Sequence, residues 1–141
     1  MKSYKFFFGL WLVVIFAFVQ VGFGQKTSRW AVKNADAFAR VELSRVRLRS
    51  CAETPKQCAL NVLRASDDAV SETPTSVEIF DFGKNKIVVL ATYKVDEDDS
   101  LVGTRYRVEF NKNAEKYEFV QLGKQFKCVR DRTDWSKKLC P

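Results

Sequence analysis

The feature that most constrains this fold is a two-residue alternation of apolar and polar side chains through the second half of the chain. It is clearest in residues 86–95 and 104–110. A period of two places successive side chains on opposite faces of a β-strand. The sequence therefore predicts a four-stranded antiparallel meander, with strands at residues 76–82, 86–95, 104–110 and 116–122.

Polar segments separate these strands and predict the turns of the meander. They are residues 83–85, the acidic run 96–99 and residues 111–115. The run 96–99 lacks the spaced ligands and closing glutamate of a calcium loop, so a solvated turn is the favoured interpretation. The last strand is expected to continue beyond a bend at Gly123 and to bring Phe126 onto the sheet.

The strand at residues 104–110 has two chemically different faces. Tyr106, Val108 and Phe110 alternate with Arg105 and Arg107. The aromatic and aliphatic side chains are expected to point into a core, and the two arginines are expected to point outward.

Helices are expected in the first half. Thr54, Pro55 and Gln57 form a helix start, with a cap, a proline in the first turn and a capping-box glutamine, and this helix should end near Ser66. Residues 35–43 also suit a helix. Residues 41–50 fit either a helix or a strand, because arginines alternate with apolar residues there.

The expected fold class is α+β. The N-terminal helices, from residues 34–66, would cover one face of the meander, and a disulfide would tie the C-terminal tail. Cystatin-like and NTF2-like domains are similar in this plan, but the similarity lies in the order of elements alone and implies no function.

The first 24 residues have the organisation of an export signal. Lys2 and Lys5 precede an apolar run at 6–19, and Gly22 and Gly24 provide small residues for cleavage after Gly24. The apolar run is shorter than the roughly 20 residues of a spanning helix, which argues against a membrane anchor. We therefore expect a secreted or periplasmic protein with a single domain at residues 25–141.

The sequence contains 4 cysteines, and in an exported chain an even number indicates disulfides. Of the three possible pairings we favour Cys51 with Cys58 and Cys128 with Cys140, because each pair is close in sequence and flanks a polar loop. A zinc site is disfavoured because the cysteines lack the usual C-x-x-C spacing.

The chain contains no histidine. This removes the Ser-His-Asp and Cys-His arrangements, the usual neutral-pH general base and the commonest metal ligand. Carboxylate-pair chemistry is open in principle, but the sequence has no pair of acids in a recognisable setting. The sequence therefore predicts a protein that is not an enzyme and that holds no cofactor and no metal.

The C-terminal tail combines basic residues, a tryptophan and two cysteines. It resembles the ending of small exported bacterial proteins of unknown function, which finish with a strand, a glycine, a cysteine, an arginine-containing loop, a tryptophan and a last cysteine. The matching residues are Tyr106, Gly123, Cys128, Arg132, Trp135 and Cys140. The resemblance implies export and a Cys128–Cys140 bridge, and it brings no activity.

Two interpretations of the tail follow. The favoured one is a structural clasp in which Trp135 packs against the sheet or its edge. The other is a basic and aromatic binding surface for an anionic partner.

The sequence favours a secreted binding module, with another envelope or extracellular protein as its expected partner. The alternative is a binder of polyanions, such as nucleic acid, acidic glycan or anionic lipid. The net charge of +7 falls to 7 − 2 = +5 without Lys2 and Lys5, and the acidic and basic parts of the chain can pair with each other, so the overall charge does not decide this. The residues proposed for binding are Arg105, Arg107, Arg130, Arg132 and Trp135.

Overall fold

The computed structural model describes residues 27–43, 50–66, 72–95, 100–130 and 133–141. The predicted export signal, the acidic run 96–99 and Arg132 lie outside these residues. The described elements are α1 (Arg29–Lys33), the 3₁₀ turn η1 (Ala35–Ala37), β1 (Ala39–Val41), β2 (Ser50–Cys51), α2 (Pro55–Ala65), β3 (Ser76–Asp81), β4 (Lys86–Lys94), β5 (Leu101–Asn113) and β6 (Lys116–Cys128).

The predicted meander is confirmed as the centre of a larger sheet. Strands β3 to β6 pair antiparallel in chain order, and the sheet order is β1-β6-β5-β4-β3, with β2 also paired to β6. The prediction of four strands was wrong, because the structure has a six-stranded sheet. The two additional strands are only two and three residues long, too short for their alternation to stand out in the sequence.

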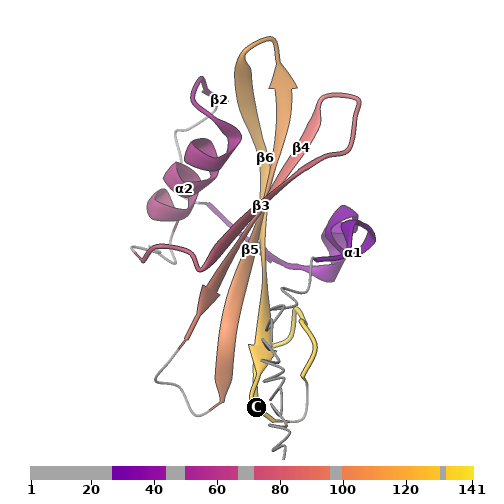
Figure 1. Ribbon diagram of the computed structural model, residues 1–141, viewed down its shortest axis with the longest axis vertical. Coiled ribbons are helices and arrows are strands. Elements are labelled where there is room, and N and C mark those ends of the chain that lie inside the picture. The colour runs from indigo at the N-terminus through magenta and orange to yellow at the C-terminus, as the bar shows by residue number, and fades with distance from the viewer. Residues whose placement is uncertain (1–26, 44–49, 67–71, 96–99, 131–132) are drawn as a thin grey trace, which may run out of the picture.

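The hairpin of β5 and β6 is longer and tighter than expected. β5 continues to Asn113 and β6 begins at Lys116, so the turn predicted at residues 111–115 narrows to Ala114 and Glu115. Ala114 adopts the left-handed conformation with φ 52°. In Figure 1 this hairpin extends beyond the helices at one end of the sheet.

β6 runs without a break through Gly123 to Cys128, which confirms the expected extension of the last strand. Gly123 allows a close approach of another segment: a Cβ placed there would lie 2.7 Å from Cβ of Phe38. The absence of a side chain at residue 123 therefore lets the chain around Phe38 lie directly on the sheet.

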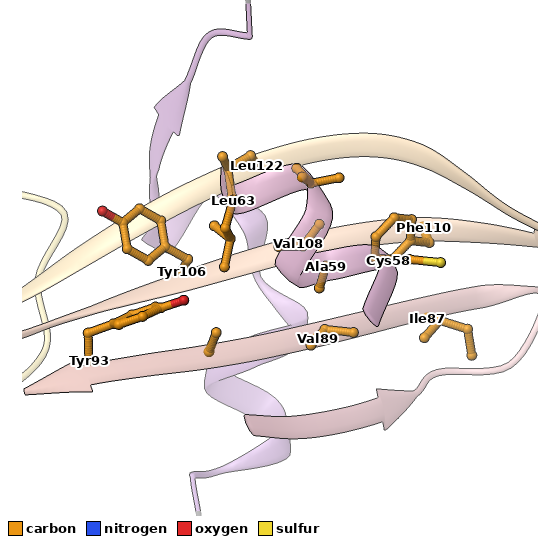
Figure 2. Close-up of a cluster of buried hydrophobic side chains, with 12 residues drawn as sticks. Cys58, Ala59, Leu63, Ile87, Val89, Tyr93, Tyr106, Val108, Phe110 and Leu122 are labelled. Carbon is orange, nitrogen blue, oxygen red and sulfur yellow. The ribbon is translucent and has the colours of Figure 1, made fainter. Parts of the chain in front are cut away.

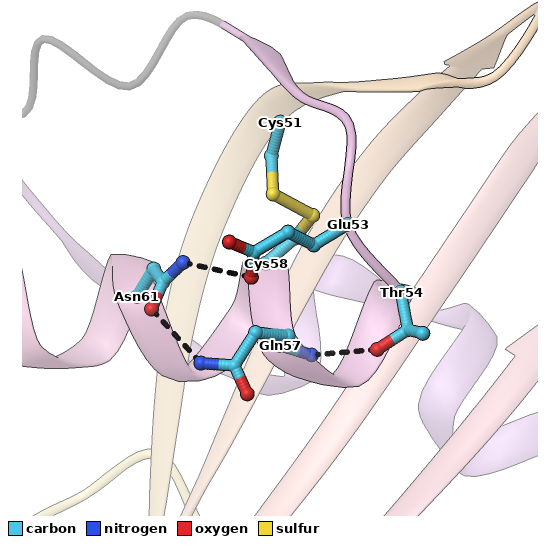
Figure 3. The surroundings of a disulfide bond; sticks show 6 residues. All are labelled: Cys51, Glu53, Thr54, Gln57, Cys58 and Asn61. Carbon is cyan, nitrogen blue, oxygen red and sulfur yellow. Dashed lines mark hydrogen bonds between the residues drawn. A yellow bond between two sulfur atoms is a disulfide. The ribbon is translucent and has the colours of Figure 1, made fainter.

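Helix α2 begins as the sequence predicts. The Thr54 hydroxyl accepts a hydrogen bond from the backbone N–H of Gln57 at 3.3 Å, Pro55 occupies the first turn, and Ser66 ends the helix (Figure 3). The disulfide between Cys51 and Cys58 joins this helix to β2 and confirms the first predicted pair.

The main core lies between α2 and one face of the sheet (Figure 2). Tyr106, Val108 and Phe110 of β5 point into it, as predicted. α2 contributes Cys58, Ala59, Val62 and Leu63, and the other buried members are Ile87, Val89, Ala91, Tyr93 and Leu122.

The helix predicted at residues 35–43 was wrong. The chain forms η1 and then β1, which pairs with β6 so that Arg40 lies opposite Gly123 and Val41 opposite Leu122. Val41 packs on the α2 core, and Phe38 lies on the other face. Pairing with a long, already formed strand outweighs helix propensity in a segment this short. Of the undecided residues 41–50, residues 44–49 lie outside the described parts.

The helices were expected to cover one face of the sheet, and α2 does so, but a further short helix, α1, lies on the other side. Figure 1 shows α2 and α1 on opposite sides of the sheet. On the α1 side, Val32 and Phe38 form a second buried cluster with Val88 and Leu90 of β4. The sheet is therefore covered on both faces, by different parts of the chain.

Candidate functional site

Arg105 and Arg107 lie on the face of β5 opposite Tyr106, as the alternation predicts, but they are not exposed. Arg105 is 6% exposed and Arg107 is 1% exposed. The expectation of an outward basic patch was wrong, because the N-terminal segment and the C-terminal tail cover this face. We call it the cationic face, and define it by Arg105, Arg107 and Glu109 of β5 with the residues that cover them.

Arg107 is held between the N-terminal segment and Glu109. Its Nε donates to the backbone oxygen of Val32 at 2.8 Å. Its Nη2 lies 2.7 Å from Oε2 of Glu109 in a direct ion pair. The guanidinium also lies over the ring of Phe38, at 5.9 Å from its centroid.

Glu109 is the carboxylate of the cationic face. Lys86 Nζ lies 2.8 Å from its Oε1, and Gln121 Nε2 donates to its Oε2 at 2.9 Å. Burial by itself would raise the pKa of Glu109, but hydrogen bonds from Lys86 and Gln121 and the charge of Arg107 outweigh it and lower the pKa below its ordinary value. Glu109 is therefore ionised at neutral pH.

Arg105 has no carboxylate of its own in the described structure. Its Nε donates to Oε1 of Gln125 at 2.7 Å, and the amide of Gln125 donates in turn to the backbone oxygen of Ala37 at 2.7 Å. Burial lowers the pKa of Arg105 to about 10, partly opposed by the charge of Glu78. The side chain remains positively charged at neutral pH, so this face carries a buried cation held by amides and aromatic rings.

Trp135 lies against the sheet, as the clasp interpretation predicts. The Arg105 guanidinium stacks on its ring at 4.5 Å from the centroid, and its Cη2 lies 3.6 Å from the position of a Cβ on Gly103. Next to it, the backbones of Ser136 and Phe126 exchange hydrogen bonds of 2.8 and 3.0 Å. The disulfide between Cys128 and Cys140 holds the segment and confirms the second predicted pair.

The structure thus brings together three of the five proposed binding residues: Arg105, Arg107 and Trp135. Arg130 is exposed at the start of the tail, and Arg132 lies outside the described residues. The sequence analysis missed Phe38 and Gln125. The alternation of Phe38 and Arg40 with Ala39 and Val41 was the available signal for a strand there.

A pocket of about 310 Å³ opens at the border of the cationic face, where the N-terminal segment, β1, β6 and the tail meet. Arg107 forms part of its wall, together with Arg40 and Lys137. Lys137 also donates from Nζ to the backbone oxygen of Asp36 at 3.0 Å, which links the tail to the N-terminal segment.

A second surface is the open edge of the sheet at β3. β3 ends the strand order, and no other described strand pairs with its outer side. Phe82 N donates a hydrogen bond to Lys86 O. Because hydrogen-bonded and non-hydrogen-bonded positions alternate along an antiparallel pair, the backbone N–H and C=O groups of Val77, Ile79 and Asp81 point away from β4. The oxygen of Asp81 accepts a hydrogen bond from Arg29, whereas Ile79 is 51% exposed.

Two further observations concern the described residues. None of their helices is long and apolar enough to cross a membrane. They also contain no cluster of three or more cysteine or acidic side chains suited to a metal ion.

Comparison with protein-family models, curated proteins and solved structures finds no match.

Proposed function

We propose that this chain is an exported, non-enzymatic binding module that engages another envelope or extracellular protein. The observation that carries the proposal is the open edge of β3. An exposed strand edge is a template for a further strand, and natural proteins usually protect such edges.

The proposed mode of binding is strand addition. An extended segment of the partner would pair with the outward backbone groups of Val77 and Ile79, and an apolar side chain of that segment would contact Ile79. Main-chain hydrogen bonds would supply affinity, and the contact at Ile79 would contribute specificity.

Helix α1 provides a neighbouring apolar contact. Arg29 donates to the oxygen of Asp81 and lies over the ring of Phe82, at 5.2 Å from its centroid, so α1 is fixed beside the end of β3. The next residue, Trp30, is 78% exposed. Exposed tryptophans of this kind frequently anchor protein interfaces.

Two features of the sequence support a non-enzymatic, exported role. The chain lacks histidine, and two disulfides tie its described segments together, as is typical of exported domains. The polyanion alternative relied on a basic sheet face, and the burial of Arg105 and Arg107 removes these two residues from its solvent-facing surface.

The test is capture of a partner from the native extracellular or envelope fraction, with three forms of the immobilised protein. Ile79→Lys places a charge on the open edge, as natural edge strands do, and should abolish capture. Val120→Lys is the matched control, because Val120 is 41% exposed on β6, away from β3. It should capture the same partner as the wild type.

The salt dependence of binding distinguishes the two functions. Capture by strand addition should change little between about 0.1 M and about 1 M salt, whereas binding of a polyanion falls steeply over that range. Loss of capture at high salt, or equal capture by Ile79→Lys and Val120→Lys, would rule out the edge as the binding surface.

A further inference from the structure

We propose that the pocket beside Arg107 binds a carboxylate group. This site is separate from the open edge, because none of its lining residues belongs to β3. Its volume of about 310 Å³ is at the lower end of the range for ligand pockets. It therefore suits a small organic acid or the last residue of a peptide.

Arg107 anchors the site. It is almost fully buried and its direction is fixed, because Nε donates to Val32 and the guanidinium packs on Phe38. Its Nη2 lies 2.7 Å from Oε2 of Glu109 in an ion pair, which fixes the guanidinium on that side as well. Arg107 therefore places a fixed positive charge in the wall of the pocket, where it attracts an anionic ligand.

The remaining charges leave the pocket electropositive. Glu109 pairs with both Lys86 and Arg107, so these three side chains together carry one net positive charge. At the pocket itself, the lining has three cations, Arg40, Arg107 and Lys137, against the single carboxylate of Asp36.

The two rim cations are not neutralised by strong pairs. Lys137 donates to a neutral backbone oxygen of residue 36. Arg40 lies 3.1 Å from Glu42, but both side chains are more than two-thirds exposed, and exposed pairs of this kind contribute little. An incoming anion would therefore meet Arg40 and Lys137 at the mouth of the pocket and Arg107 deeper inside.

The rest of the wall favours a carboxylate over an inorganic anion. Phe38 and Leu122 provide apolar surface next to the cations. A ligand with an acid group and a short apolar portion can use both parts, whereas phosphate or sulfate can use only the charges. The planar guanidinium also matches the geometry of a carboxylate.

The experiment is a titration of the ¹⁵N-labelled exported protein followed by NMR. The probes are isovalerate, the peptide acetyl-Gly-Gly-Leu with a free carboxylate, the same peptide amidated, and inorganic phosphate. We expect saturable shifts around Arg107 and Gly123 with isovalerate or the free-acid peptide. The tighter of these two identifies the source of the carboxylate as a free acid or a partner's C-terminus.

Charge-removing variants assign the binding to the pocket. Arg40→Gln and Lys137→Gln should each weaken binding about threefold or more. Arg130→Gln is the matched control, because Arg130 is exposed and does not line the pocket. It should bind as the wild type does.

Four results would overturn the proposal. They are no saturation by either acid up to about 10 mM, equal binding of the amidated peptide, tighter binding of phosphate, and equal weakening by Arg130→Gln and Lys137→Gln. None of these results depends on partner capture by the β3 edge, so the two proposals can fail separately.

Discussion

The two faces of strand β5 are built by opposite chemistry. From β5, Phe110 and Val108 enter an apolar core under α2, whereas Arg107 and Glu109 enter a buried network under the N-terminal segment. The comparison shows that alternation predicts which side chains share a face and leaves open whether that face is covered. Charged residues can occupy a covered face when other segments bring the partners they need.

The energetics of the two faces should differ accordingly. The apolar face is stabilised by buried area and close packing, which tolerate substitutions that conserve volume. The cationic face depends on complete sets of polar partners, because an unpaired buried charge is costly. Variants that remove single groups from each face test this difference.

The largest effect is expected on the apolar face. Phe110→Ala removes a side chain that is 1% exposed and contacts both Tyr117 and Phe119 edge-on. It should lower the free energy of unfolding by about 3–5 kcal/mol, measured by urea denaturation. Val120→Ala, at an exposed position of β6, is the control and should change it by less than about 0.5 kcal/mol.

The next effect concerns the ion pair of the cationic face. Glu109→Leu leaves Arg107 buried without its carboxylate and should cost about 3 kcal/mol. Arg107→Leu combined with Glu109→Leu should cost clearly less than the sum of the two single variants, because the double change leaves neither charge of this pair unpaired. Additive effects would show that the two residues do not act as a unit.

A smaller effect is expected at the clasp. Trp135→Ala removes the ring that stacks on Arg105, and it should lower the free energy of unfolding by about 2 kcal/mol, with a lower melting temperature. Arg130→Gln should leave the melting temperature nearly unchanged. A Trp135→Ala protein that melts like the wild type would contradict the clasp.

The smallest effect is expected on the pH dependence of stability. Because the pKa of Glu109 is lowered in the folded state, its ionisation stabilises the fold above the ordinary glutamate pKa of 4.5, and this contribution is lost as pH falls through the lower folded pKa. The difference in urea midpoint between the wild type and Glu109→Gln should therefore shrink below pH 4.5. For the exposed Glu42→Gln, the difference should stay near zero throughout.

The strands of the meander, helix α2 and both disulfides could be predicted because their signals are local. Alternation over residues 86–95, the Thr54 cap and the short cysteine spacings each involve neighbouring residues. β1 and the cover of the cationic face could not be predicted in this way. They depend on Gly123 admitting Phe38 and on Arg107 reaching Val32, which are contacts between distant parts of the chain.

The candidate site was also predicted only in part. Trp135 against the sheet followed from its aromatic character and its position between the last two cysteines. The burial of Arg105 could not be inferred, because a strand of arginines alternating with aromatics has the same sequence whether its polar face meets solvent or another segment. The open edge at β3 depends on the strand order, which local patterns do not specify.

The cationic face also has a consequence for the order of folding. Its hydrogen bonds join residues far apart in the chain: Arg107 to Val32 spans 75 positions, Gln125 to Ala37 spans 88, and Lys137 to Asp36 spans 101. Closing such long loops costs chain entropy before the contacts form, so the hairpins and α2 should assemble first. The apolar face can therefore be complete while the arginines of β5 remain hydrated, and the two halves of the core then form at separate times.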